Sequence, residues 1–404
     1  MTRLGGLVLL ALGVTASAVV FESRPLGVVG VGLVVAVALA GAWSAGVRGP
    51  ATVEFAAAPS PATEGDHVRL RAEGRRTSRV LVGSAFVHAR LGRLGDVECR
   101  LRGHGRSAVG ELHLGRLPRG RFEISSPRLV LGDHLGLATV VTPLGDPGVA
   151  VVVHPRLVEL DRLFSEVGRQ GADGRRLLLR RPAGFDFHSV REYEQGESLR
   201  RVHWPTTARR GQLMVKELDD APRDAVVVLL DCDPRGAVGA APESSFDTAV
   251  RAAGSVLRVY SARGRRATLL ATGAGATPHS VCSLGGDFRA ALDALAAVEP
   301  DAPHGLARAL ASQETAAGRA GELVVVSATL DAASLEAVLA SATRRLVSLV
   351  WIDAPSYAGR PTQALPGLLR LASSGVPVAV VRRGAGLAEA LDASLYVPGV
   401  AARA

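Results

Sequence analysis

The sequence predicts a protein of mixed class, α/β plus β, with three structural parts. These are an N-terminal transmembrane helical hairpin, a small antiparallel β-sandwich and a doubly wound parallel-sheet domain. Two uncharged apolar runs open the chain, alternating apolar and polar residues follow, and short continuous apolar runs between helical stretches fill the second half. The 404 residues are ample for several domains. We place these at 1–48, 49–155 and 224–404, with a connector at 156–223.

The two opening runs, Leu4–Val20 and Leu26–Trp43, are free of charged residues. At about 1.5 Å per residue each reaches roughly 26 Å, which suits a thin membrane or a tight hairpin. Arg3 and Arg48 flank the pair and favour a multi-pass protein of the inner membrane with its bulk in the cytoplasm. The alternative is a cleaved signal peptide ending near Ala16–Ala18, after which the second run still spans.

The cysteine content and the net charge indicate which cellular compartment and which classes of partner suit this protein. The three cysteines, Cys99, Cys232 and Cys282, are far apart and form no CxxC pair, so we expect three buried free thiols in a reducing compartment. The net charge is +9, and Lys216 is the only lysine. We expect no nucleic-acid binding, because no basic run is interleaved with stacking aromatics outside residues 185–217.

Between about residues 52 and 142 the apolar residues recur with period two, as expected of strands with one buried face. Gly and Pro separate these strands, and their spacing favours a small sandwich. The clearest alternating runs are His67–Arg71, Val97–Leu101, Glu111–Leu114 and Arg121–Ile124.

From about Asp224 onward, short apolar runs of the kind buried on both faces alternate with helical stretches, which predicts a doubly wound parallel sheet. The predicted strands are Ala225–Leu230, Ala267–Ala271, Leu323–Val326, Leu346–Ile352 and Val376–Val381. The predicted helices are Ser244–Ala262, Asp287–Val298, Asp331–Arg345 and Gln363–Ser373, with Ser244, Asp287 and Asp331 as N-caps.

Ligands of such sheets bind beyond the carboxyl ends of the strands, where Asp231–Asp233, Ser327–Thr329 and Asp353 fall. The carboxylates of Asp231 and Asp233 could share a magnesium ion. The alternative is an acidic turn in which Arg235 neutralises Asp233.

The most unusual stretch is Phe185–Glu217, which crowds aromatic, acidic and arginine residues just before the first parallel strand. One interpretation is a connector whose charges brace the sandwich against the parallel-sheet domain. The other is a docking surface, because Trp, Tyr and Arg are enriched at interaction hot spots. The candidate partner-binding residues are Arg191, Glu192, Tyr193, Glu197, Arg200, His203, Trp204 and Arg209.

At these same residues the chain resembles a bacterial family, the domain of unknown function 58. The family motif appears here as Phe187, Arg191-Glu192-Tyr193, Gly196-Glu197, Arg200, His203-Trp204, Thr207-Ala208-Arg209 and Leu213-Met214-Val215-Lys216. Upstream segments also resemble the family: Arg119–Phe122, Asp133–Leu137 and Val153–Pro155. Two substitutions depart from the motif, because Glu197 and His203 each stand where the family has Asp.

The resemblance implies that the last domain is similar to a von Willebrand factor type A domain, in which an Asp-x-Ser-x-Ser loop binds a divalent metal. Here the loop is Asp231-Cys232-Asp233-Pro234-Arg235 without serines, so the resemblance implies a degenerate divalent-metal site and no other cofactor. It also implies a partner, either a MoxR-type AAA+ ATPase or a transglutaminase-like membrane protein.

The sequence carries no GxSxG, HExxH or P-loop signature. We therefore expect a membrane-anchored, non-enzymatic adaptor that binds a protein through residues 185–217 and the strand ends near Asp231. The alternative function is a metal-dependent hydrolase, or metal-mediated adhesion, that uses Asp231 and Asp233.

Overall fold

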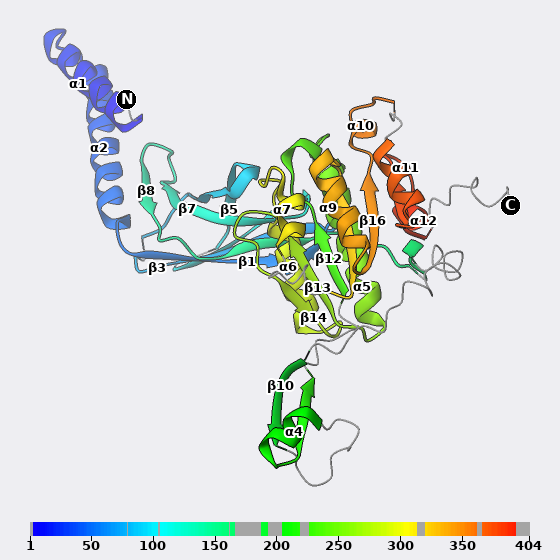
Figure 1. Ribbon diagram of the computed structural model, residues 1–404. Helices are drawn as coiled ribbons and strands as arrows, with labels where there is room; N and C mark the ends of the chain where they lie inside the picture. The colour runs from blue at the N-terminus through cyan, green and yellow to red at the C-terminus, as the bar shows by residue number, and fades with distance from the viewer. Residues whose placement is uncertain are drawn as a thin grey trace. The chain divides into compact units, whose positions relative to one another are not determined.

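The computed structural model describes residues 3–78, 80–103, 106–160, 162–165, 187–192, 204–218, 226–312, 320–361 and 366–392. The chain divides into two compact units, Met1–Arg156 and Leu157–Ala404 (Figure 1).

The first unit opens with two apolar helices, α1 (Arg3–Val20) and α2 (Arg24–Val47). They pack together closely at Gly30, where a Cβ atom would lie 2.9 Å from the Thr15 hydroxyl oxygen. Among the described residues, α2 alone is long and apolar enough to cross a membrane, because the apolar part of α1, Gly5–Val20, is shorter. The expectation of a multi-pass protein is therefore not supported, whereas one candidate span is present.

A small β-domain follows, built of two sheets. One sheet has the order β1-β3-β6, and the other has the order β2-β9-β7-β4-β5 with β8 also paired to β7. Every pairing is antiparallel except that of β2 with β9. The strands are β1 (Ala51–Ala58), β2 (Ala62–Thr63), β3 (His67–Arg76), β4 (Ser84–Leu91), β5 (Asp96–Leu101), β6 (Ser107–Arg116), β7 (Gly120–Gly132), β8 (Thr139–Pro143) and β9 (Ala150–His154), and a 3-10 turn, η1 (Gly92–Leu94), joins β4 to β5.

The core of this domain follows the period-two pattern. In β3, Val68, Leu70 and Ala72 are buried while His67 and Arg69 are exposed. Both sheets contribute to one apolar cluster, so alternate side chains of each strand are removed from water. The predicted one-faced strands are confirmed.

The second unit contains a six-stranded sheet in the order β14-β13-β12-β15-β16-β17. Its pairings are parallel except for the short edge strand β14, which runs antiparallel to β13. The strands are β12 (Val226–Leu230), β13 (Ala267–Ala271), β14 (His279–Val281), β15 (Glu322–Ser327), β16 (Leu346–Ile352) and β17 (Val378–Val381). The helices are α5 (Ser245–Ala262), α6 (Gly286–Ala297), α7 (Gly305–Ala311), α9 (Ala332–Ala342), α10 (Ala354–Tyr357), α11 (Pro366–Ser373) and α12 (Leu387–Asp392), with a 3-10 turn, η3 (Pro234–Gly236).

Both faces of this sheet are covered by helices (Figure 1). Val226, Val228 and Leu230 of β12 belong to one buried cluster with side chains of α5, α6 and α12. The alternate residues Val227 and Leu229 belong to a second cluster with side chains of α7, α9 and α11. Burial on both sides explains why these strands are continuous apolar runs rather than alternating ones.

The five predicted strands and four predicted helices of this unit are present with small shifts at their ends. Ser244 caps α5 through the Asp247 N–H, and Asp331 caps α9 through the Ser334 N–H, as predicted. The prediction for Asp287 is wrong, because α6 begins at Gly286 and Asp287 lies in its first turn. The short elements β14, α7 and α12 were not predicted, since three to seven residues carry too little periodicity.

The three cysteines are free, as expected. Cys99 and Cys232 are buried, and burial raises the pKa of the Cys232 thiol to about 11, so it stays uncharged in the core. The expectation of burial is wrong for Cys282, which is exposed in the turn that follows the edge strand β14.

Candidate functional site

The central strands of the parallel sheet bring two sequence-predicted positions together. β12 pairs in parallel with β15, with Leu230 opposite Val326, so Asp231 and Ser327 reach the same edge of the sheet. From this pair the chain order runs outward in both directions, through β13 and β14 on one side and β16 and β17 on the other. Doubly wound sheets bind ligands at this switch point, beyond the carboxyl ends of the strands.

Asp231 is held by two hydroxyl groups at this point. The residue is only 5% exposed, and its Oδ2 lies within hydrogen-bond distance of Ser327 Oγ at 2.6 Å and Thr329 Oγ1 at 2.9 Å. Its Oδ1 is buried and has no hydrogen-bond partner among the described residues. Burial raises the pKa of Asp231, and the two hydroxyl bonds offset this only in part.

The hydrogen bonds around Ser327 accommodate a protonated Asp231. Ser327 Oγ lies 2.6 Å from both Asp231 Oδ2 and the Thr329 carbonyl oxygen, yet a hydroxyl has one hydrogen to donate. If that hydrogen goes to the Thr329 carbonyl, the contact with Asp231 requires a hydrogen on the carboxyl group. Ser327 Oγ then accepts from Asp231 and from the Thr329 N–H, at 3.0 Å, which fills both lone pairs.

Asp233 is bound to the guanidinium group of Arg235. Arg235 Nε lies 3.0 and 3.1 Å from the two carboxylate oxygens, and the backbone N–H groups of Arg235 and His304 donate to the same carboxylate. Burial alone would raise the pKa of Asp233, but the hydrogen bonds from Arg235 and His304 outweigh it and lower the pKa. The acidic turn neutralised by Arg235 is therefore present.

Arg235 also reaches a carboxylate from the β15–α9 loop. Its Nη2 donates to Asp331 Oδ2 at 3.0 Å, and the same oxygen lies 2.9 Å from His304 Nδ1. The other oxygen, Oδ1, caps α9 through the Ser334 N–H, and this bond is the main cause that holds the pKa of Asp331 far below its usual range. Asp331 therefore has both a structural bond and an ionic one.

We call Asp231, Asp233, Arg235, His304, Ser327, Thr329 and Asp331 the strand-end cluster. Of these, the sequence pointed to Asp231, Asp233, Ser327 and Thr329 as strand-end residues. It predicted Arg235 only as the neighbour that neutralises Asp233, and Asp331 only as a helix N-cap. It did not identify His304. The loop before α7 contributes His304, with φ of 55° in the left-handed region, and no sequence pattern indicated that loop.

A divalent cation fits the cluster only if Arg235 moves away. The oxygens of Asp233 and Asp331 that face each other already bind the guanidinium group. Asp231 Oδ1 and the hydroxyls of Ser327 and Thr329 are oxygen ligands of the type that magnesium accepts. Within the part of the chain that the structure describes, no group of three or more His, Cys, Asp or Glu side chains is arranged to hold a metal ion.

Asp353, the third predicted strand-end residue, follows β16 and is buried. Its carboxylate lies 3.6 Å from Arg382 Nε. It therefore has an ion pair of its own beside β17.

The candidate partner-binding segment contains a hairpin, β10 (Phe187–Glu192) with β11 (Met214–Leu218), and a short helix, α4 (Trp204–Arg210). Strand pairing sets Arg191 opposite Val215 and Glu192 opposite Met214. Tyr193, Glu197, Arg200 and His203 lie outside the described residues.

Local hydrogen bonds fix α4 against the start of β11. Thr207 Oγ1 accepts from the Met214 N–H at 3.0 Å, and Gly211, with φ of 67°, closes the turn by donating to the Thr207 carbonyl. Met214 is buried, whereas Trp204 at the start of the helix is 65% exposed and Arg209 in its last turn is exposed. The helix thus presents an aromatic and a basic side chain to water.

Residues 189–366 match the model of the family described as "Protein of unknown function DUF58". This range includes β11, the parallel sheet as far as β16, and the whole strand-end cluster.

One curated protein, "Uncharacterized protein YeaD" of Bacillus subtilis (strain 168), is 30% identical over 129 residues. The match covers 31% of this chain and 31% of that protein, so the chain matches about a third of its relative's length.

Two solved structures show weak similarity, each at 10% identity. A β-glucosidase from Listeria innocua in complex with gluconolactone aligns with a TM-score of 0.13 over 24% of this chain and 16% of that chain. Cwp6 from Clostridium difficile aligns with a TM-score of 0.21 over 81% of this chain and 49% of that chain. Scores this low carry no argument about fold or function.

Proposed function

We propose that this protein is a membrane-anchored adaptor that binds a partner protein and carries out no catalysis of its own. The apolar helix α2 would anchor it in the inner membrane, with the bulk of the chain in the cytoplasm. The β10–α4–β11 segment and the strand-end cluster would form the binding surfaces.

The observation that carries this proposal is Trp204. Tryptophan is the residue with the largest apolar surface, and a folded chain normally buries most of it. Here the side chain is 65% exposed on a helix that hydrogen bonds hold in place. Exposed Trp and Arg are residue types enriched at interaction hot spots, and this helix carries both.

The finer fold that we propose for the second unit is von Willebrand A-like. Support comes from the strand order, which is the doubly wound order 3-2-1-4-5-6, and from the acidic loop after the first central strand. In this proposal Arg235 supplies the positive charge that a metal ion supplies in metal-binding relatives. The partner would be a MoxR-type AAA+ ATPase or a transglutaminase-like membrane protein.

The test measures binding of the detergent-solubilised full chain to a purified MoxR-type ATPase from the same cell by biolayer interferometry. Trp204→Ala should weaken binding by roughly tenfold or more, as expected for loss of a hot-spot residue. Leu369→Ala is the matched control, because Leu369 is 58% exposed on α11 and lies outside the proposed surface. Its affinity should be unchanged.

A different result would favour the connector interpretation. If Trp204→Ala lowers the melting temperature but leaves the dissociation constant unchanged, the segment braces the fold and does not dock. The same assay with the transglutaminase-like protein separates the two proposed partners.

A metal-dependent hydrolase or metal-mediated adhesion is the second candidate, and one observation favours it. The buried Asp231 Oδ1 has no hydrogen-bond partner among the described residues, as expected for an oxygen atom that coordinates a bound cation. Elemental analysis of the purified protein tests it. Stoichiometric magnesium or manganese that disappears in Asp231→Ala would support this function over the adaptor.

A further inference from the structure

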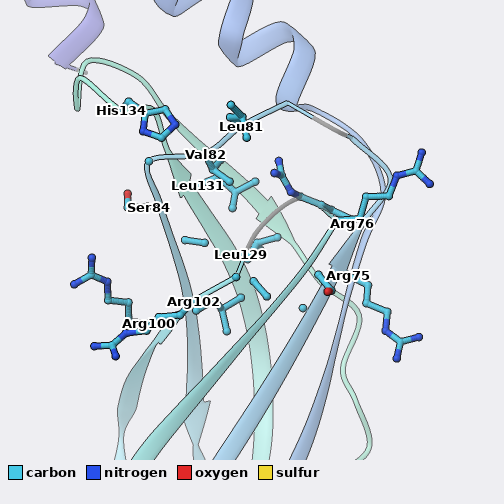
Figure 2. A pocket seen from close by; sticks show the side chains of 18 residues that line it. Arg75, Arg76, Leu81, Val82, Ser84, Arg100, Arg102, Leu129, Leu131 and His134 are labelled. Atoms are coloured by element: carbon cyan, nitrogen blue, oxygen red, sulfur yellow. The ribbon is translucent and has the colours of Figure 1, made fainter.

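The β-domain of the first unit contains a cavity of about 500 Å³ that the proposed adaptor function does not use. Its interior is apolar, with Leu101, Leu129 and Leu131 buried and Val82 partly buried. Figure 2 shows Leu129 and Leu131 between the strands, below the end of α2. The cavity is therefore an apolar recess at one end of the small β-domain.

Arginines surround its opening. Five of the 18 lining residues are arginines and none is acidic: Arg75, Arg76, Arg100, Arg102 and Arg106. In Figure 2 the Arg76 guanidinium group turns inward over the leucines, while Arg75, Arg100 and Arg102 extend outward from the rim. We call these five residues the arginine rim.

Most of the positive charge of the rim is not balanced nearby. Arg75 pairs with Glu73 at 3.1 Å, and Arg100 lies 6.0 Å above the Phe86 ring. Within the described residues, no ion pair involves Arg100, Arg102 or Arg106. Arg76 Nη2 donates to the Val80 carbonyl at 2.6 Å, and burial lowers the pKa of its guanidinium group. An anion at the mouth would balance the charges of Arg100, Arg102 and Arg106.

The opening lies at the end of the apolar helix α2. Trp43 in the last turns of α2 donates its Nε1–H to the carbonyl of Leu81, a lining residue, at 2.7 Å. Ser78 Oγ donates to the Gly46 carbonyl at 2.8 Å. These bonds fix the loop before β4, and with it one wall of the cavity, to the helix end.

This location is the membrane interface if α2 spans. The helix has 24 residues, which corresponds to about 36 Å at 1.5 Å per residue, so its end reaches the head-group layer. Tryptophan in the last turns is typical of that layer. Leu81, 66% exposed, lines the opening, and Leu135, 70% exposed, directly follows the lining residue His134.

We propose that this cavity binds an anionic phospholipid, with the phosphate group on the arginine rim and the first part of an acyl chain against the leucines. The inference rests on the membrane anchoring of the proposed function. Arginine forks suit phosphate oxygens, and an apolar recess beside a head-group site suits a chain that enters from the bilayer.

The test uses the full chain solubilised in mild detergent. Native mass spectrometry measures bound phosphatidylglycerol after micelles are doped with equal amounts of phosphatidylglycerol and phosphatidylcholine. The wild-type protein should retain phosphatidylglycerol preferentially, and Arg100→Gln/Arg102→Gln should reduce retention by roughly tenfold or more, because two interfacial arginines are lost. The control Arg90→Gln/Arg116→Gln removes the same charge from exposed positions of β4 and β6 that do not line the cavity, and it should retain the lipid.

Each contrary outcome has a distinct meaning. Equal retention by the rim variant, or an equal loss in the control, would overturn the cavity site. Displacement of the lipid by inorganic phosphate or glycerol phosphate at matched concentration would identify a soluble phosphate compound as the ligand instead. Release of the wild-type protein from cell membranes by alkaline carbonate would overturn the anchoring, whereas the doped micelles would still report on the cavity.

Discussion

The strand-end cluster and the arginine rim differ in whether the charge of their arginine side chains is balanced by nearby carboxylates. Arg235 lies between Asp233 and Asp331, so its charge is satisfied within the fold. Arg102 and Arg106 line a cavity without an acidic lining residue. The difference teaches that an arginine count does not locate a binding site. What matters is whether the folded chain supplies the opposite charge itself, because compensated arginines hold structure and uncompensated ones can bind an external anion.

Among substitutions that test this difference, Arg235→Ala is expected to cause the largest loss of folding stability. Arg235→Ala leaves the buried Asp233 carboxylate without its cation, and loss of one partner of a buried pair is costly. Because the arginine side chain is itself 46% exposed, we discount the full penalty and expect about 2–3 kcal/mol less stability at neutral pH. Urea unfolding of the full chain in detergent measures it.

Arg258→Ala is the control for this change, because Arg258 pairs at 2.8 Å with Glu159, which is 85% exposed. That exposed pair should contribute less than about 1 kcal/mol. Similar losses in the two variants would show that the strand-end pair is an ordinary surface pair.

A smaller effect is expected at Asp231, and it depends on pH. The pKa of Asp231 is raised in the folded state, so folding favours the neutral carboxyl group. The stability that this group contributes is therefore fully present below about pH 4, the pKa in the unfolded chain, and is lost as pH rises through the pKa in the folded protein. Asp231→Asn keeps a hydrogen donor for Ser327 but cannot ionise. The variant should therefore gain stability relative to wild type as pH increases from 4 to 8, by about 1.4 kcal/mol for each unit of pKa shift.

Urea midpoints at several pH values within this range measure the difference. A difference that stays constant with pH would contradict a raised pKa for the Asp231 carboxyl group. Asp231→Ala, which removes both hydroxyl contacts, should instead be less stable than Asp231→Asn at every pH.

The smallest effect is expected on the rim. Arg102→Gln should change the free energy of unfolding by no more than about 0.5 kcal/mol, because the side chain is exposed and has no ion pair within the described residues. Thermal unfolding followed by circular dichroism measures it. A loss close to that of Arg235→Ala would place Arg102 among the structural arginines and remove the contrast between the two regions.

Much of the fold could be predicted because burial leaves a periodic signature. The strands Ala267–Ala271 and Leu346–Ile352 match the sequence prediction residue for residue, since burial on both faces produces continuous apolar runs. Asp331 could be predicted as a cap from its position before an apolar helix. Asp287 could not be placed correctly, because two glycines precede it and the helix starts at the second of them.

The strand-end cluster could be predicted only in part. The pattern showed that Asp231 and Ser327 end neighbouring strands, which is a consequence of sheet topology. It did not show that Arg235 bridges to Asp331, 96 residues later, or that His304 joins them from another loop. The arginine rim was not predicted at all, because its members come from β3, β5 and the turn before β6, and only folding brings them around one opening.

The two edge strands of the parallel sheet restrict how this unit can bind another molecule. On one side the outermost strand, β14, has three residues, and on the other β17 has four. Such short borders offer few unpaired main-chain groups to an incoming extended peptide, so lateral extension of the sheet by a foreign strand is disfavoured. Association through this unit would therefore depend on side-chain chemistry at its loops, and this sheet should resist edge-to-edge aggregation.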